Sequence, residues 1–217
     1  MEGRRSLVVV AAGLRQPSST RLLADRLAAA TERHLLDAGL AADVETLELR
    51  DHAHDLVNHL LTGFPSPRLQ AAIDAVAGAD GLIAVTPVFS ASYSGVFKVF
   101  VDVLERDGLA GKPVLLGATG GTARHSLVLE HAMRPLFAYF GAASVPTAVY
   151  AASEDWGPAG VASDSGLVAR IDRAARELAT AMAGRPAASD RAARNAFDDP
   201  VPFETLLAEV DPRTERD

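Results

Sequence analysis

Five short apolar segments alternate along the chain with longer segments in which apolar residues recur every three or four positions. The short segments are rich in Val, Leu and Ile and lack the strict alternation expected of a half-exposed sheet, so we predict strands buried on both faces. The predicted strands span Leu7 to Ala12, Val44 to Leu49, Gly81 to Thr86, Pro113 to Ala118 and Ser144 to Ala151.

The intervening segments have the spacing of amphipathic helices. The predicted helices span Thr20 to Ala38, Pro67 to Ala77, Gly95 to Arg106, His125 to Phe140 and Gly166 to Ala183. Strands that alternate with helices through short connections predict an α/β fold, a doubly wound five-stranded parallel sheet with helices on both faces. In the strand order 2-1-3-4-5, ligands bind beyond the carboxyl ends of the strands where the order reverses.

Gly184 and Pro186 stop the last predicted helix, which ends at Ala183. We therefore predict one domain over residues 1–184 and a polar C-terminal extension over 185–217. The extension contains one apolar stripe at helical spacing, which predicts a short amphipathic helix: Phe203, Leu206, Leu207 and Val210.

Composition excludes several classes of protein. The chain has no cysteine, which excludes disulfides and thiolate chemistry, and 21 Lys and Arg against 28 Asp and Glu give a net charge of −7, which disfavours nucleic acid as a partner. The apolar run from Leu7 to Leu14 follows two arginines as in a signal peptide, but it fits a buried strand better. No apolar run approaches the roughly 20 residues that span a bilayer, so a cytoplasmic protein is expected.

The segment after the first predicted strand, Gly13 to Thr20 (GLRQPSST), leads into a helix. Hydroxyl groups, an arginine and free helix N–H groups at one helix start can bind a phosphate. The alternative is that Ser18 or Ser19 is only the helix N-cap. Neither a GxGxxG fingerprint nor a P-loop is present, so the dinucleotide-binding and P-loop classes are excluded.

Two further predicted strand ends have unusual compositions. Thr86 to Gly95 (TPVFSASYSG) combines a proline, aromatic rings and small hydroxyls, while Gly117 to His125 (GATGGTARH) has adjacent glycines that allow close approach of a ligand. Each segment taken alone could be an ordinary turn. The predicted strand order would bring all three segments together at one switch point.

These residues resemble the flavodoxin-like NAD(P)H-dependent FMN reductases, and Ala118 to Phe140 is similar to the two-component members that supply reduced FMN to luciferase-like monooxygenases. The resemblance covers about Leu7 to Ala183. It implies a flavodoxin-like fold, FMN, hydride transfer from NADPH or NADH, a homodimer or higher homo-oligomer, and a flavin-dependent monooxygenase as partner. Val88 and Phe89 depart from the acidic residue and the tyrosine of many relatives.

The resemblance also implies a set of cofactor-binding residues. Those expected at the FMN phosphate are Arg15, Ser18, Ser19 and Thr20; those along the ring system are Pro87, Val88, Phe89 and Ser90; those at its pyrimidine end are Thr119, Gly120, Gly121 and Thr122. No side chain is implied as catalytic, because hydride passes between stacked rings. His125 is a candidate flavin contact.

Other readings compete with this one. The cluster Asp51 to His59 (DHAHDLVNH) has the residue types of a metal site, but a solvated helix start or lid segment is favoured, and no metal is expected. A serine hydrolase would need a GxSxG elbow, which is missing. A flavodoxin-type electron carrier and a quinone or azo reductase share the fold. A carrier would cover the flavin with aromatic rings, whereas Gly120 and Gly121 leave one face open.

Overall fold

The computed structural model describes residues 3–157 and 166–187, which belong to a compact unit comprising Met1–Arg185 and to the first residues after it. The helix predicted around Phe203 lies outside the described residues. Of the described helices, none is long and apolar enough to cross a membrane.

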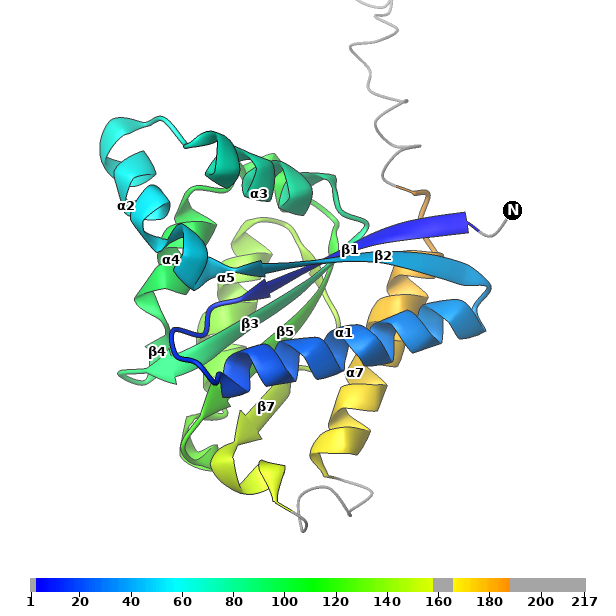
Figure 1. The fold of residues 1–217 in the computed structure, drawn as a ribbon. Helices are drawn as coiled ribbons and strands as arrows, with labels where there is room; N and C mark the ends of the chain where they lie inside the picture. Colours follow the sequence, from blue (N-terminus) through cyan, green and yellow to red (C-terminus); the bar gives the residue numbers. More distant parts are fainter. Residues whose placement is uncertain (1–2, 158–165, 188–217) are drawn as a thin grey trace, which may run out of the picture. The chain divides into compact units, whose positions relative to one another are not determined.

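The centre of the unit is a sheet of seven strands in the order β2-β1-β3-β5-β6, with β4 paired to β3 and β7 paired to β5 (Figure 1). All pairs are parallel except β3 with β4. The order confirms the predicted 2-1-3-4-5 arrangement, but the predicted count of five strands is wrong. The strands are β1 (Gly3–Ala11), β2 (Leu40–Glu48), β3 (Gly81–Phe89), β4 (Ser92–Tyr93), β5 (Pro113–Gly120), β6 (Ala143–Ser144) and β7 (Val149–Ala152).

The two additional strands have separate physical origins. The predicted fifth strand is split into β6 and β7 around Pro146, which has no N–H to donate to the ladder. The segment predicted as a loop after the third strand continues the strand to Phe89 and then turns back as β4, so that it forms a β-hairpin.

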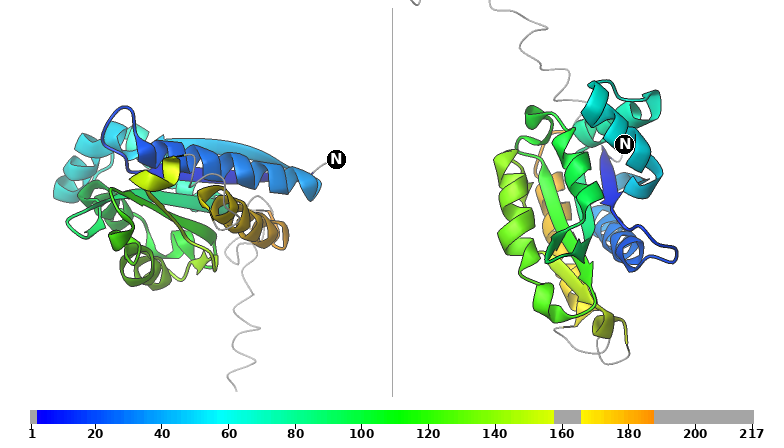
Figure 2. Two further views of the ribbon diagram at one scale, coloured as in Figure 1. Left: turned by 90° about the horizontal axis from the view of Figure 1, so that it is seen from below. Right: turned by 90° about the vertical axis from the view of Figure 1, so that its left-hand side faces the viewer.

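Successive residues of the central strands point to two different cores, and both are buried. Val8, Val10 and Leu116 pack with α3 (Pro67–Gly78), α4 (Gly95–Asp102) and α5 (Arg134–Tyr139) on one face. Leu7, Val9 and Leu115 pack on the other face with α1 (Ser19–Asp37) and α7 (Leu167–Ala183), so that helices cover both sides of the sheet (Figure 2). Burial on both faces explains why the strands appear in the sequence as continuous apolar runs.

The helix predicted from His125 to Phe140 is not continuous. The structure has a 3-10 helix at Ala123–His125, a π-helix at Leu129–Met133 and then α5. Pro135 cannot donate to the carbonyl four residues before it, which disfavours a regular α-helix through this stretch. The predicted helix from Gly95 likewise ends early, at Asp102, and a 3-10 helix follows at Arg106–Leu109.

Of the two readings favoured for the histidine-rich segment, a helix start and a lid segment, the structure shows a helix start, and the helix that follows was not predicted. A 3-10 helix, Leu49–His52, runs into α2 (Ala53–Thr62), whose Leu56 is buried in the core. The described residues contain no group of three or more His, Asp or Glu that could hold a metal ion.

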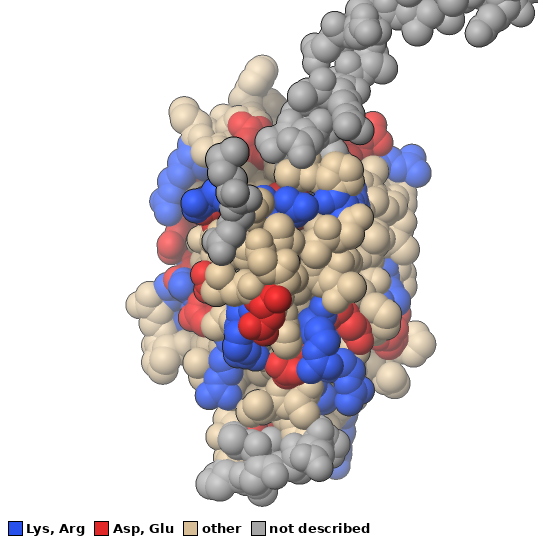
Figure 3. Space-filling model, turned by 90° about the vertical axis from the view of Figure 1, so that its right-hand side faces the viewer, with Lys and Arg blue, Asp and Glu red and all other residues tan. Residues whose placement is uncertain are grey.

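Charged residues of both signs are interspersed on the described part of the face at the amino ends of the strands (Figure 3). One of the ion-pair clusters joins helices α1 and α7. Asp172 of α7 accepts hydrogen bonds from Arg33 and His34 of α1, each at 2.9 Å, and pairs with Arg176 of its own helix. Burial would raise the pKa of Asp172, but the hydrogen bonds from His34 and Arg33 together with the nearby positive charges outweigh it, so the pKa is lowered.

We expect Asp172→Asn to lower the free energy of unfolding by roughly 0.5–1 kcal/mol at pH 7, because the carboxylate is partly shielded and contacts several cations. A lowered pKa means that the contribution is present above the unfolded value of 3.8 and is lost as the pH falls through the folded value. Urea unfolding of both proteins between pH 7 and pH 3 measures the difference, which should shrink on acidification. The matched control is Asp43→Asn, which removes an exposed pair with Arg4 and should have a smaller effect. A difference that is independent of pH would contradict the assignment.

Candidate functional site

The segment between β1 and α1 places hydroxyl groups at the start of a helix. Ser18 is the N-cap of α1, and its side-chain oxygen accepts from the N–H of Arg21 at 3.2 Å. Gly13 is required beneath it, since a Cβ there would lie 2.1 Å from the Ser18 oxygen. The N-cap role that the sequence left open is therefore real, but the hydroxyl retains its own proton as a donor.

Thr20 joins this segment to the end of β5. Its hydroxyl lies 2.8 Å from the hydroxyl of Thr119, and the two residues are only 2 % and 3 % exposed. Two hydroxyl groups carry two protons and share one hydrogen bond, so one O–H of the pair is left to donate elsewhere. A buried donor without an acceptor is costly, which favours a ligand oxygen at this point.

The hairpin after β3 is held in place by its own polar side chains. The N–H of Ser94 donates to the hydroxyl of Thr86 at 3.0 Å, and the hydroxyl of Ser94 in turn caps α4. At the tip, Ser90 and Ala91 have φ of 49° and 66°, the left-handed region that glycine and asparagine usually occupy in such turns. Backbone strain of this kind is concentrated at functional sites.

The four hairpin residues predicted to line a ring differ in exposure. Pro87 is buried in the sheet and pairs in register with Thr119, which places the second and third segments side by side. Val88 is half-buried against the core, whereas Phe89 is 48 % exposed and Ser90 is exposed beside it. The hairpin therefore presents one aromatic ring and a short stretch of backbone at the carboxyl edge of the sheet.

The two glycines at the end of β5 have different environments. A Cβ at Gly120 would lie 2.1 Å from the hydroxyl oxygen of Tyr150, so only glycine fits there. Gly121 is exposed, and a Cβ added to it would meet nothing within 4 Å. Thr122 and His125 are also exposed. The sequence predicted open space at both glycines; the structure leaves it at Gly121 only, because the Tyr150 hydroxyl fills the space at Gly120.

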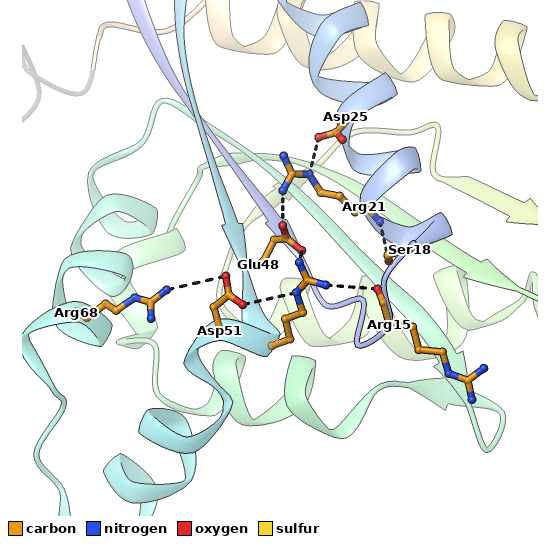
Figure 4. Close-up of polar contacts among 8 residues, drawn as sticks. Arg15, Ser18, Arg21, Asp25, Glu48, Asp51 and Arg68 are labelled. Carbon is orange, nitrogen blue, oxygen red and sulfur yellow. Dashed lines mark hydrogen bonds and ion pairs between the residues drawn. The ribbon is translucent and has the colours of Figure 1, made fainter.

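An ion network fixes the first segment from the side of β2 (Figure 4). Glu48 pairs with Arg21 at 2.6 Å and with Arg50 at 2.7 Å, and Arg50 lies 3.5 Å from the carbonyl of Arg15. The pKa of Arg21 is raised by its hydrogen bond to Asp25, opposed by partial burial. The guanidinium of Arg15 points away from the network (Figure 4), and within residues 3–157 and 166–187 it has no acidic partner. Arg15 is thus available for an anion, whereas Arg21 is already neutralised.

The structure brings together the three segments that the sequence singled out. Sequence reasoning missed Gly13, Glu48, Arg50 and Tyr150, whose roles depend on contacts between distant segments. Only Gly13 carried a local signal, because a glycine directly after a buried strand often marks close approach of backbone.

Residues for FMN are available at this edge of the sheet. The buried Thr20 and Thr119 pair offers an unused donor, Arg15 offers a positive charge, and the space at Gly121 would accommodate a ring face. The strand order and these polar segments define the flavodoxin-like class of α/β proteins. The WrbA-like flavodoxin from Agrobacterium tumefaciens shares the fold, with a TM-score of 0.56, 19 % identity and coverage of 84 % of this chain and 99 % of that one.

The chain belongs to the NADPH-dependent FMN reductase family, whose model matches residues 6–157. It is therefore an oxidoreductase of the NAD(P)H-dependent FMN reductase class, with FMN and a reduced nicotinamide nucleotide as its cofactors.

Named relatives agree with the family. FMN reductase (NADPH) from Pseudomonas aeruginosa is 38 % identical over 179 residues, 82 % of this chain and 93 % of the relative. The NADH-dependent FMN reductase SfnF from Pseudomonas fluorescens is 36 % identical over 80 % of this chain and 89 % of its own length. Among solved structures, an oxidoreductase from Corynebacterium diphtheriae has a TM-score of 0.80 at 43 % identity and covers 86 % of this chain and all of its own.

The two glycines give a test of the geometry at the end of β5. We expect Gly120→Ala to lower the free energy of unfolding by about 1–3 kcal/mol, the usual cost of overpacking, because the new methyl group would collide with the Tyr150 hydroxyl. The matched control, Gly121→Ala, should change it by less than about 0.5 kcal/mol.

The same collision predicts a rescue. In a Tyr150→Phe background the nearest atom to the new methyl group would be a ring carbon at 3.2 Å, so the cost of Gly120→Ala should fall. A double-mutant cycle by chemical denaturation measures the coupling. Equal costs in the two backgrounds would contradict the contact.

Proposed function

We propose that this chain reduces FMN with hydride from NADPH or NADH and supplies the reduced flavin to a partner monooxygenase. Family membership supports the reaction, and the names of the NADH-dependent relatives SfnF and SfnE suggest the two-component setting. The observation that carries the proposal is Gly121, which leaves one side of the site open where a second ring must approach.

We assign the parts of the site as follows. Arg15, Ser18, Ser19 and Thr20 bind the FMN phosphate through charge and hydroxyl donors at the N-terminus of α1, with the first-turn N–H groups adding to the attraction. Pro87 to Ser90 line the ring system, Thr119 to Thr122 lie at its pyrimidine end, and His125 is a further contact. Bound FMN accepts hydride from a stacked nicotinamide, so no side chain has to act as an acid or base.

Two alternatives use the same fold. A flavodoxin-type electron carrier would shield the flavin with aromatic rings from both neighbouring segments, but here the segment from Thr119 to Thr122 contributes none. A quinone or azo reductase would keep the open face and differ only in the final acceptor. Activity assays with free FMN, a quinone and an azo dye as acceptors distinguish an FMN reductase from a quinone or azo reductase.

The phosphate assignment is tested at Ser18, because its cap and its ligand roles respond differently to charge. Aspartate is as good an N-cap as serine, but it would repel a phosphate. We expect Ser18→Asp to weaken FMN binding by more than about tenfold, to leave riboflavin binding nearly unchanged and to preserve the stability of the fold. Fluorescence titrations with both flavins measure this. If Ser18→Asp binds FMN like the wild type, Ser18 is a cap only.

The catalytic proposal is tested at Gly121. Purified protein should oxidise NADPH or NADH in the presence of FMN faster than FMN alone does. We expect Gly121→Trp to reduce this rate at least about tenfold while FMN affinity is spared, because the indole would cover the face that the nicotinamide needs. Gly121→Ala is the control. Wild-type protein that binds FMN but oxidises neither nucleotide would refute the reductase and favour the carrier.

We also propose a homodimer or higher homo-oligomer, a cytoplasmic location and a reductase domain over residues 1–184 followed by the extension 185–217. An exposed apolar stripe on and after α2 supports a subunit interface; its residues are Val57, Leu60, Leu61 and Phe64. The sedimentation coefficient of a monomer at micromolar concentration would contradict the oligomer.

A further inference from the structure

We infer that Tyr150 is a positioning residue for the flavin ring, acting through the backbone of residues 120–122. The inference rests on the proposed function, because it requires that this backbone meets the ring. Nothing in the sequence pattern marks Tyr150, which lies in an apolar strand and is only 4 % exposed.

The hydroxyl of Tyr150 packs against the end of β5. It donates to the carbonyl oxygen of Thr122 at 2.9 Å, and it fills the space that the missing side chain of Gly120 leaves. In the part of the chain that the structure describes, this is the only side-chain hydrogen bond to the backbone of residues 120–122. Gly121 lies between these two contacts, so the backbone before it is packed against the Tyr150 hydroxyl at Gly120 and the backbone after it is hydrogen-bonded at the Thr122 carbonyl.

Tyr150 is itself rigidly held. Arg170 of α7 donates to the backbone carbonyl of Tyr150 at 3.0 Å and to Asp155 at 2.7 Å, and Asp155 accepts from the N–H of Ala152 at 2.8 Å. Burial and the nearby Asp155 raise the pKa of Tyr150, so its hydroxyl stays protonated and remains a donor at neutral and moderately alkaline pH. A strand residue fixed in this way can orient an exposed segment better than the segment can orient itself.

Loss of the Tyr150 hydroxyl should change the position of residues 120–122 without changing the stability of the fold. The hydrogen bond to the Thr122 carbonyl is only partly buried, so water can replace it when the hydroxyl is removed. Phenylalanine keeps the packing of the ring in the core and leaves no buried polar group behind. Removal of the hydroxyl should therefore leave the fold intact and release only the segment around Gly121.

The experiment compares Tyr150→Phe with the wild type in the full chain. We expect dissociation constants for both FMN and riboflavin to rise roughly fivefold, in line with one lost hydrogen bond, while the melting temperature stays within about 2 °C. Equal effects on the two flavins are expected because the segment is assigned to the ring, whereas Ser18→Asp should affect FMN alone. In steady state, KM for FMN should rise more than kcat falls. Tyr139→Phe, on the exposed surface of α5, is the matched control.

Each outcome decides between the claims. Tyr150→Phe that binds both flavins like the wild type overturns the positioning role and leaves the reductase proposal standing. Selective loss of FMN with riboflavin unaffected also overturns it, since the segment would then serve the phosphate. A large fall in melting temperature would show a structural role instead. Wild-type protein that binds neither flavin would refute the proposed function itself.

Discussion

Burial of the central sheet on both faces is the constraint on which the rest of the structure depends. Because Leu7 and Val8 point to opposite cores and both are buried, neither face of β1 can hold a ligand. Polar chemistry is therefore confined to the strand ends, and the parallel direction of the strands brings those ends to one edge. The hydrogen bond between Thr20 and Thr119 links this edge together, since it joins two strand-end segments that are 99 residues apart in the sequence.

This constraint also explains which parts of the fold could be predicted. A strand buried on both faces leaves an apolar run in the sequence, and the helices that cover it leave a period of three or four residues. The hairpin at Ser90 and Ala91 left no such mark, because neither residue is the glycine or asparagine that usually signals a two-residue turn. The irregular stretch before α5 was missed because the apolar spacing from Val128 to Phe140 persists through a change of helix type.

The residues of the candidate site also fall into those that the sequence could predict and those that it could not. Ser18, Thr20, Gly120 and Gly121 could be proposed because their residue types carry chemistry at a predicted strand end. Glu48 and Tyr150 could not, because their importance depends on the register between strands and on helix packing, which no local pattern encodes. Arg15 could likewise be proposed from its place in the first segment, and in the structure the neighbouring Arg21 is already paired with Asp25 and Glu48.

The three segments of the candidate site are held in place to different degrees. This arrangement suits a bound ligand that a second ligand must approach. The first segment is fixed by an N-cap and an ion network, and the third by Tyr150. The hairpin instead carries two left-handed residues that each cost about 1 kcal/mol, offset by pairing of Val88 with Tyr93 and by contact between the rings of Tyr93 and Phe97 at 5.9 Å. Phe89 is thereby presented at a defined place, while Gly121, within the segment that Tyr150 supports, remains uncovered. A flavodoxin-type carrier, which only stores electrons, would favour closure of this opening. Hydride transfer from a stacked nicotinamide requires the opening to remain.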